Sequence, residues 1–427
     1  MRRTSLLLSF LVFTAPLFSQ KALKKITSAE ASRIESVLSA DSLQGRKTGT
    51  AGIEKAADFI SNEFAAAGLQ TFAGATGYRQ VFTMVKPKQT SVSAKLDTET
   101  VEEKNIAVIT STADLKVNAS SGFKKIQIKA GDNLFREAQK ILGAKENTVV
   151  FVDTSFGKLF PNLQRVKRNI FQTPYSYVFI LTQQNPKAFE VAATHQFEEQ
   201  QLSNIVSVLP GKSRKDEYVI FSGHYDHLGI GKPVDGDSIY NGANDDAAGI
   251  TAVILLAKYY KKLRKNDRTI IFAAFTAEET GGFGSQYFSR QLDPAKVMAM
   301  FNIEMIGTES KWGKNSAYIT GYEKSDMGKI LEKNLEGSAF KFYADPYTDQ
   351  QLFYRSDNAT LARLGVPAHT ISTSKMDSEP NYHKVSDDLK TLDMTNMAEI
   401  IKAVATSAKS IVSGKDTPSR VNTADLK

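Results

Sequence analysis

Four predicted strands of this 427-residue chain each lead into a histidine or an acidic residue. The chain has no cysteine, so any metal site must use imidazole and carboxylate ligands. Open α/β sheets carry their active crevice at the carboxyl ends of the strands, where such side chains would meet. The residues in these positions are His224 and Asp226, Glu278 and Glu279, Glu304, and, after a loop, His383.

The spacing within these groups favours a metal centre with a nearby base. Asp226 lies two residues after His224, so its carboxylate could accept the second ring N–H and fix the tautomer of a metal-binding imidazole. Asp245 lies in a glycine-flanked loop before a predicted helix, where its two oxygens could bridge two cations. Of the adjacent Glu278 and Glu279, one can bind metal while the other stays free as a general base. Each unit alone is common in turns or on surfaces; the set as a whole carries the prediction.

The hydrophobic pattern supplies the elements that would position these side chains. Apolar runs bounded by charged residues are typical of buried strands, and between them lie segments with the periodicity of helices. This alternation predicts an α/β fold: a three-layer α/β/α sandwich with a mostly parallel central mixed sheet. The expected strands are Tyr218 to Ser222, Thr269 to Phe275, Val297 to Ile303 and Ala368 to Ile371; the expected helices span 245–265 and 394–412.

The amino-acid composition changes between residues 86 and 200, which are rich in Lys, Thr, Ser and Gln. We interpret this segment as an inserted β-rich lobe that interrupts a catalytic domain made of residues 21–85 and 201–413, with a flexible tail at 414–427. It has no dense cluster of histidines and acids, which favours a lid or a substrate-shaping module. Its expected strands are Ile106 to Ile109, Lys125 to Ile128, Thr148 to Val152 and Tyr177 to Leu181.

Residues 1–20 have the features of a secretory signal peptide. A positive start, Met1-Arg2-Arg3, precedes the apolar stretch Leu6 to Phe18. A buried N-terminal helix is the alternative, and Pro16 disfavours it. We therefore expect a secreted protein, periplasmic or extracellular, with no membrane span elsewhere.

The formal net charge of +8 comes from lysines scattered among acids. This distribution is typical of solvated surfaces, and no nucleic-acid-binding motif accompanies it. No nucleic-acid partner is expected, and the oligomeric state is left open.

Six motifs resemble, in their order, those of the co-catalytic di-zinc exopeptidases. That family includes bacterial leucyl aminopeptidases, plasma glutamate carboxypeptidase and glutaminyl cyclases. The similarity is good from Ser203 to about Asp393 and weaker from Ala29 to Gly68, while the position of residues 86–200 is similar to a protease-associated insert. The motifs are GHYDHLG, GANDDAAG, FTAEETGGFGS, NIEMIG, RSDNATLARLGVP and NYHKVSDD.

The resemblance implies two zinc ions per chain. His224 and Glu304 would hold one, Glu279 and His383 would hold the other, and Asp245 would bridge them. Many members have Asp in place of Glu304, whose extra methylene the backbone or the binding mode must absorb.

The resemblance also implies the catalytic groups. Glu278 would be the general base and Asp226 would orient His224, while Arg355 and Tyr382 resemble groups that stabilise a tetrahedral intermediate. The Asp245–Asp246 bond resembles a peptide that is cis in this family. Asn358 replaces a common aromatic or histidine, which could alter the substrate pocket.

The implied function is hydrolysis of a terminal peptide bond, with aminopeptidase activity on peptides as the first choice. Carboxypeptidase or dipeptidase activity is the alternative within the family. A glutaminyl-cyclase-type acyltransferase with one zinc, or a non-catalytic binding protein on this fold, are alternatives of another class. Counting metal ions separates the hydrolase from the cyclase.

Three further histidines have weaker assignments. His227 could line the cleft, His369 lies in an apolar run and is interpreted as a core residue, and His195 is expected at the surface of the insert.

Overall fold

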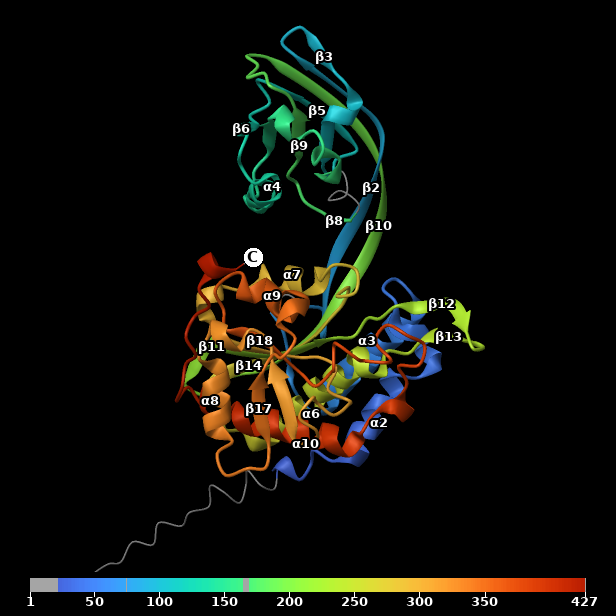
Figure 1. Ribbon diagram of the computed structural model, residues 1–427, viewed down its shortest axis with the longest axis vertical. Coiled ribbons are helices and arrows are strands. Elements are labelled where there is room, and N and C mark those ends of the chain that lie inside the picture. Colours follow the sequence, from blue (N-terminus) through green and yellow to red (C-terminus); the bar gives the residue numbers. More distant parts are fainter. Residues whose placement is uncertain (1–21, 74, 164–168, 427) are drawn as a thin grey trace, which may run out of the picture. The chain divides into compact units, whose positions relative to one another are not determined.

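A computed structural model describes residues 22–73, 75–163 and 169–426, which form two compact units. The first unit comprises the chain up to Val81 together with Leu202 onward, and the second comprises Phe82–Gln201 (Figure 1). The predicted signal peptide, residues 1–20, lies outside the described residues. No helix in the described part of the chain is both long and apolar enough to span a bilayer.

The first unit is built on a mixed sheet that is largely parallel. Its inner strands β18, β15, β11 and β14 pair in parallel, whereas β10 and β16 pair antiparallel on either side of them. The predicted fold class is therefore confirmed. The strand order is β17 (Lys341–Ala344), β16 (Ser316–Ile319), β18 (Ala368–Ser372), β15 (Val297–Ile303), β11 (Arg214–His224), β14 (Arg268–Phe275) and β10 (Phe189–Leu209).

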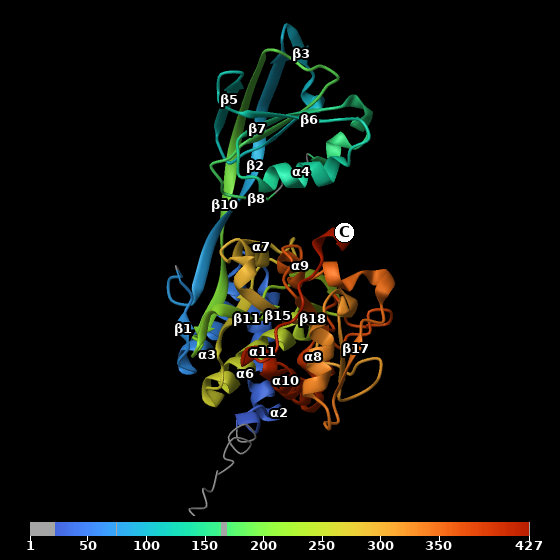
Figure 2. The ribbon, with the colours of Figure 1, turned by 90° about the vertical axis from the view of Figure 1, so that its left-hand side faces the viewer.

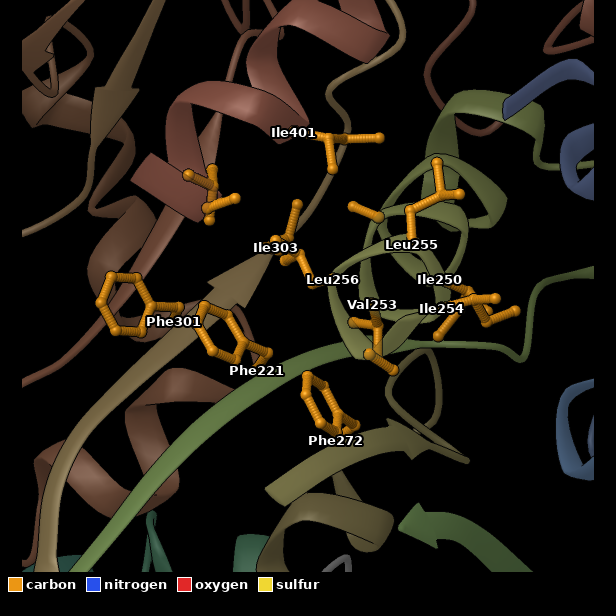
Figure 3. Packing of buried hydrophobic residues seen from close by; sticks show 14 of the residues in the cluster. Phe221, Ile250, Val253, Ile254, Leu255, Leu256, Phe272, Phe301, Ile303 and Ile401 are labelled. Atoms are coloured by element: carbon orange, nitrogen blue, oxygen red, sulfur yellow. The ribbon is translucent and has the colours of Figure 1, made fainter. Parts of the chain in front are cut away.

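Alternation along the strands fills both faces of this sheet. Phe221, Phe272 and Phe301 come from three adjacent strands and stack on one face, with the ring of Phe221 4.9 Å from that of Phe301 (Figure 3). Since each of these strands is buried on both sides, its sequence is an almost unbroken apolar run.

Helices cover both faces and complete the three layers. On the face of the phenylalanines, α6 and α10 lie side by side (Figure 2). Short helices cover the opposite face. The first layer contains α2 (Ser28–Leu38), α3 (Ala51–Ala66), α6 (Ala248–Leu263), α8 (Met327–Asn334), α10 (Met394–Ser407) and α11 (Lys409–Val412); the second contains α7 (Phe283–Ser289) and α9 (Asn358–Ala362).

Residues 414–426, expected to form a flexible tail, are instead held against the first unit. The buried Arg268 donates hydrogen bonds to the carbonyls of Ile411 and Asp416, and Arg420 donates to the carbonyl of Val297.

The second unit has its own small sheet and core. Its expected strands are present within one residue at each end, and apolar residues fill both faces of the sheet. His195, expected at the surface, is instead buried and stacks on Phe197. The sheet order is β4 (Ile106–Ile109), β9 (Tyr177–Leu181), β7 (Thr148–Val152) and β6 (Lys124–Ile128); the other elements are β2 (Arg79–Leu96), β3 (Glu99–Val101), β5 (Asp114–Asn118), α4 (Leu134–Gly143) and β8 (Ile170–Phe171).

Candidate metal centre

Three neighbouring parallel strands deliver the candidate ligands to one edge of the sheet. β11 ends at His224, Glu279 follows the end of β14, and Glu304 directly follows the end of β15. Because the strands are parallel, their carboxyl ends lie together, as the sequence predicted.

Asp245 lies between two histidines. Its Oδ1 is 3.2 Å from Nε2 of His224, and its Oδ2 is 3.2 Å from Nε2 of His383. His383 Nε2 is also 3.2 Å from Oε2 of Glu279. His224, Asp245 and Glu304 offer ligand atoms within 4.8 Å of one another, and so do His227, Asp245 and Glu279. The five predicted ligands are thus brought together, with Asp245 common to both groups.

The hydrogen bonds of His224 show that these atoms suit a cation. Its Nδ1 is 3.2 Å from the carbonyl oxygen of Asp226, and because a carbonyl can only accept, Nδ1 carries the proton. Nε2 then presents a lone pair toward Asp245, and this buried atom has no hydrogen-bond partner among the described residues. Two electron-pair donors that face each other without a proton fit a metal ion, and imidazole with carboxylate is a zinc donor set.

Asp226 orients His224 in a different way from the one expected. The carboxylate oxygen Oδ1 is 3.8 Å from the ring, and the hydrogen bond to the ring goes to the backbone carbonyl instead. Oδ1 accepts the backbone N–H of Glu278 at 3.0 Å. Asp226 therefore ties the end of β11 to the end of β14. Burial raises the pKa of Asp226 to about 7.

Glu278 has the environment of a proton-transfer group. Burial, together with the charges of Glu304 and Asp357, raises the pKa of Glu278 well above its usual range. It follows Ala277, whose φ of 58° is left-handed, so the chain turns sharply out of β14 at this point. A carboxyl group with a raised pKa beside a metal site is suited to general acid and base catalysis.

Glu304 is fixed from two sides. Its carboxylate accepts a hydrogen bond from Ser356 and lies 3.5 Å from the side-chain nitrogen of Asn302. Burial raises the pKa of Glu304 to about 7. Met305, the next residue, has a left-handed φ of 53°. These contacts hold the carboxylate of Glu304 at the end of β15.

Asp387 and Arg46 hold the Asp245 loop. The two carboxylate oxygens of Asp387 accept the backbone N–H groups of Asn244 and Asp245, at 2.8 and 3.0 Å. The fully buried guanidinium of Arg46 donates to four carbonyls. Those carbonyls belong to Leu38, Tyr225, Asn241 and Gly242. Burial raises the pKa of Asp387 to about 6.

Asp246 ties three ligand-bearing segments together. Its Oδ2 accepts the backbone N–H of His224 at 3.1 Å, and its Oδ1 accepts those of Gly249 and Met305 at 3.0 and 3.1 Å. The Asp245–Asp246 peptide is cis, as the resemblance implied.

A small cleft beside Glu304 is lined by the two predicted oxyanion groups. Arg355 Nη2 is 3.5 Å from the hydroxyl of Tyr382, whose ring stacks on His383 at 4.0 Å. Burial raises the pKa of Tyr382 to about 12, so the phenol keeps its proton at neutral pH and can donate it in a hydrogen bond. Apolar side chains of the cleft include Tyr318, Leu352 and Met376.

Two assignments are corrected and one is confirmed. His227, which was considered as a residue that could line the cleft, is fully buried and faces Glu279. Asn358 does not line the cleft: it is buried and donates to the carbonyls of Phe353 and Ala368. His369 is a core residue, as interpreted.

Sequence reasoning did not identify His227 as a neighbour of Glu279, and it assigned no role to Arg46 or Asp387. It named Asp246 only for its cis peptide bond and missed its hydrogen bonds. The available signal was a charged residue inside a segment that resembles the family. Arg46 lies in LQGRKTGT, residues 43–50 of the weakly similar N-terminal region, and Asp387 is the first Asp of the final pair in NYHKVSDD.

Comparison with known sequences agrees with this geometry. Residues 204–408 match the family model described as "Peptidase family M28". A "Probable leucine aminopeptidase" of Trichophyton verrucosum is 28% identical over 208 residues, covering 47% of this chain and 54% of the relative. A "Probable zinc metalloprotease" of Pyrenophora tritici-repentis is 34% identical over 108 residues, 25% of this chain and 24% of the relative. The chain thus spans about half the length of the first curated relatives it matches, or less.

Solved structures share the fold. An aminopeptidase from Aneurinibacillus sp. strain AM-1 superposes with a TM-score of 0.54 at 16% identity, covering 92% of this chain and 95% of that one. A glutaminyl cyclase of Porphyromonas gingivalis gives a TM-score of 0.50 at 12% identity, covering 90% and 99%. At these identities the likeness establishes the fold alone.

Proposed function

We propose that this protein is an exported zinc aminopeptidase, because residues 204–408 match the model described as "Peptidase family M28" and the buried histidines and carboxylates could hold metal. It would hydrolyse the N-terminal peptide bond of peptides and use two zinc ions. The names of the curated relatives favour the aminopeptidase over a carboxypeptidase or a dipeptidase. The signal-like sequence of residues 1–20 supports export to the periplasm or the extracellular space.

The observation that carries the proposal is the position of Asp245 between His224 and His383, one facing each carboxylate oxygen. His224 and Glu304 would hold one zinc with Asp245, and Glu279 and His383 would hold the other. When bound, the two ions supply Lewis acidity that makes water a nucleophile at neutral pH and polarises the scissile carbonyl.

The residues of the chain then handle the protons. Glu278 takes a proton from the attacking water as the water oxygen bonds to the carbonyl carbon. It returns that proton to the amide nitrogen when the C–N bond breaks, so the products are a free amine and a carboxylic acid, which then loses its remaining proton to water. The hydroxyl of Tyr382, helped by Arg355, donates to the oxygen that becomes negative in the transition state.

Replacing Glu278 by Gln tests the assignment. We expect Glu278→Gln to keep its zinc and its fold but to lose about 10²–10⁴-fold in kcat, since only the proton transfer is removed. The exposed Glu336→Gln is the matched control and should retain activity. A panel of aminoacyl, dipeptide and N-acyl substrates, with zinc measured on the same samples, would establish which end is cleaved. Near-normal turnover in Glu278→Gln would refute its role.

The shared fold of a glutaminyl cyclase makes the acyltransferase the second candidate. Two zinc ions per chain would favour the hydrolase, and one zinc with cyclisation of N-terminal glutamine would favour the cyclase. A fully metallated protein that turns over none of these substrates would indicate a binding protein.

A further inference from the structure

His227 contacts the Glu279 carboxylate on the side away from His383. Its Nδ1 is 2.7 Å from Oε1 of Glu279, whereas the other oxygen, Oε2, is 3.2 Å from Nε2 of His383. The two oxygens of Glu279 are thus divided between two histidines. Oε2 faces His383, a predicted metal ligand, and Oε1 faces His227. Oε2 can therefore bind metal while Oε1 accepts a hydrogen bond.

The ring of His227 is confined in this position. Its side chain is fully buried, and its backbone N–H donates to the carbonyl of Arg46 at 3.2 Å. A Cβ added at Gly242 would lie 2.6 Å from ring atoms Cγ and Cδ2, so the loop that carries Asp245 packs directly on the imidazole. The ring of His383 stands edge-on at 5.8 Å. A group held this firmly can fix the orientation of its hydrogen-bond partner.

The position of the proton follows from the chemistry of a metal-binding carboxylate. An ionised carboxylate can only accept hydrogen bonds, so Nδ1 of His227 must donate to Oε1. Nε2 has no hydrogen-bond partner among the described residues. His227 therefore acts on the carboxylate through Nδ1 alone.

We propose that His227 is a positioning residue of the metal centre: it fixes the Glu279 carboxylate so that Oε2 points toward the zinc shared with Asp245 and His383. The inference rests on the proposed two-zinc centre and adds a residue to it. Hydrogen bonds to ligating groups typically account for 10–100-fold in metal affinity. We expect the zinc on the Glu279 side to depend most on His227, because among the described residues the contacts of His224 and Glu304 run to residues such as Asp245 and Ser356 instead.

Three variants separate this role from others. His227→Ala removes both ring nitrogens, whereas His227→Asn retains an N–H donor at the position of Nδ1 and has no atom at the position of Nε2. His369→Asn is the matched control, because His369 is also buried but its hydrogen bonds join Thr320 and Ser325. Thermal unfolding of the metal-free proteins would confirm that each variant is folded.

The readout is zinc affinity, measured by chelator competition on metal-free protein, with the visible spectrum of the cobalt-substituted protein as a probe of ligand geometry. We expect His227→Ala to weaken one of two zinc sites by 10–100-fold and to leave the other within about threefold. His227→Asn should recover most of that loss, and His369→Asn should bind as the wild type does.

If the wild type binds two zincs, either of two results would overturn this inference and leave the two-zinc centre standing. One is an unchanged zinc affinity in His227→Ala, and the other is a loss of zinc affinity in His227→Asn as large as that in His227→Ala. The second result would mean that Nε2 ligates the metal. A wild-type protein that binds fewer than two zincs would refute the two-zinc centre itself, and the inference with it.

Discussion

Some buried side chains hold the ligand-bearing segments through hydrogen bonds to backbone atoms, and we call these hydrogen bonds tethers. Replacing Asp246 by Asn tests whether such tethers, rather than the metal ions, position the metal ligands. The carboxylate of Asp246 accepts three backbone N–H groups, one on Oδ2 from His224 and two on Oδ1 from Gly249 and Met305. An amide has the same shape but only one accepting end. Whichever way the amide is turned, at least one of the three N–H groups faces another donor.

The structure sets the size of the effect. With the amide oxygen in the position of Oδ1, two hydrogen bonds remain and the N–H of His224 is left buried without an acceptor. Losing a hydrogen bond to a charged acceptor and leaving a buried donor unpaired costs about 2–4 kcal/mol. The side chain has little room to move away from the unpaired N–H group. The backbone packs so closely that a Cβ added at Gly249 would lie only 2.4 and 2.5 Å from the two carboxylate oxygens of Asp246.

The assay is urea unfolding of the metal-free protein followed by circular dichroism. Asp246→Asn should unfold at a clearly lower urea concentration than the wild type, and its zinc affinity on the His224 side should fall as well. Asp235→Asn, at an exposed turn, is the matched control and should unfold within about 0.5 kcal/mol of the wild type. Equal stability of Asp246→Asn and the wild type would refute the view that this carboxylate holds the ligand segments.

Two further predictions concern Glu35 and Arg46. Burial raises the pKa of Glu35 from its usual 4.5 to about 8, so the folded protein keeps a proton that the unfolded chain releases. Its contribution to stability is therefore complete below pH 4.5 and is lost as the pH rises toward 8, at up to about 1.4 kcal/mol per pH unit. Glu35→Gln should remove this slope when unfolding free energies are compared between pH 4.5 and 8, and a variant that keeps the wild-type slope would contradict the assignment. Arg46→Lys keeps the charge but replaces the planar fork by one nitrogen, which cannot serve the four carbonyls that Arg46 now reaches. We expect a loss of about 2–5 kcal/mol in urea unfolding and weaker zinc binding, against little change in the exposed Arg264→Lys; a variant as stable as the wild type would show that the carbonyls find other donors.

The strand ends could be predicted because the information is local. An unbroken apolar run such as Thr269 to Phe275 marks a buried strand, and the next polar residue must leave the sheet at its edge. Parallel pairing then brings together the ends of strands that are far apart in the chain. The positions of His224, Glu279 and Glu304 and the fold class follow from that inference, whereas Asp245 and His383 lie outside the strands and are assigned as zinc ligands through the family resemblance.

The tethers could not be predicted, because their partners are backbone atoms far away in sequence. Arg46 reaches a carbonyl 179 residues away, and Asp387 accepts an N–H from 143 residues away. Backbone atoms are the same at every residue, so no residue type marks the partner. Asp226 illustrates the limit at short range: the sequence indicated the correct neighbour, but its carbonyl rather than its carboxylate meets His224.

The backbone of the site explains why so many tethers are present. Ala277, Met305 and His383 have φ values of 58°, 53° and 55°, a left-handed conformation that costs non-glycine residues roughly 1–2 kcal/mol. Such conformations persist only where surrounding contacts determine them. Two of these three residues lie at a tether. The carboxylate of Asp246 accepts the backbone N–H of Met305, and the carboxylate of Asp226 accepts that of Glu278, the residue after Ala277. The ligand geometry is therefore imposed by hydrogen bonds within the chain, so metal affinity should fall when a tether is removed even though every ligand is kept.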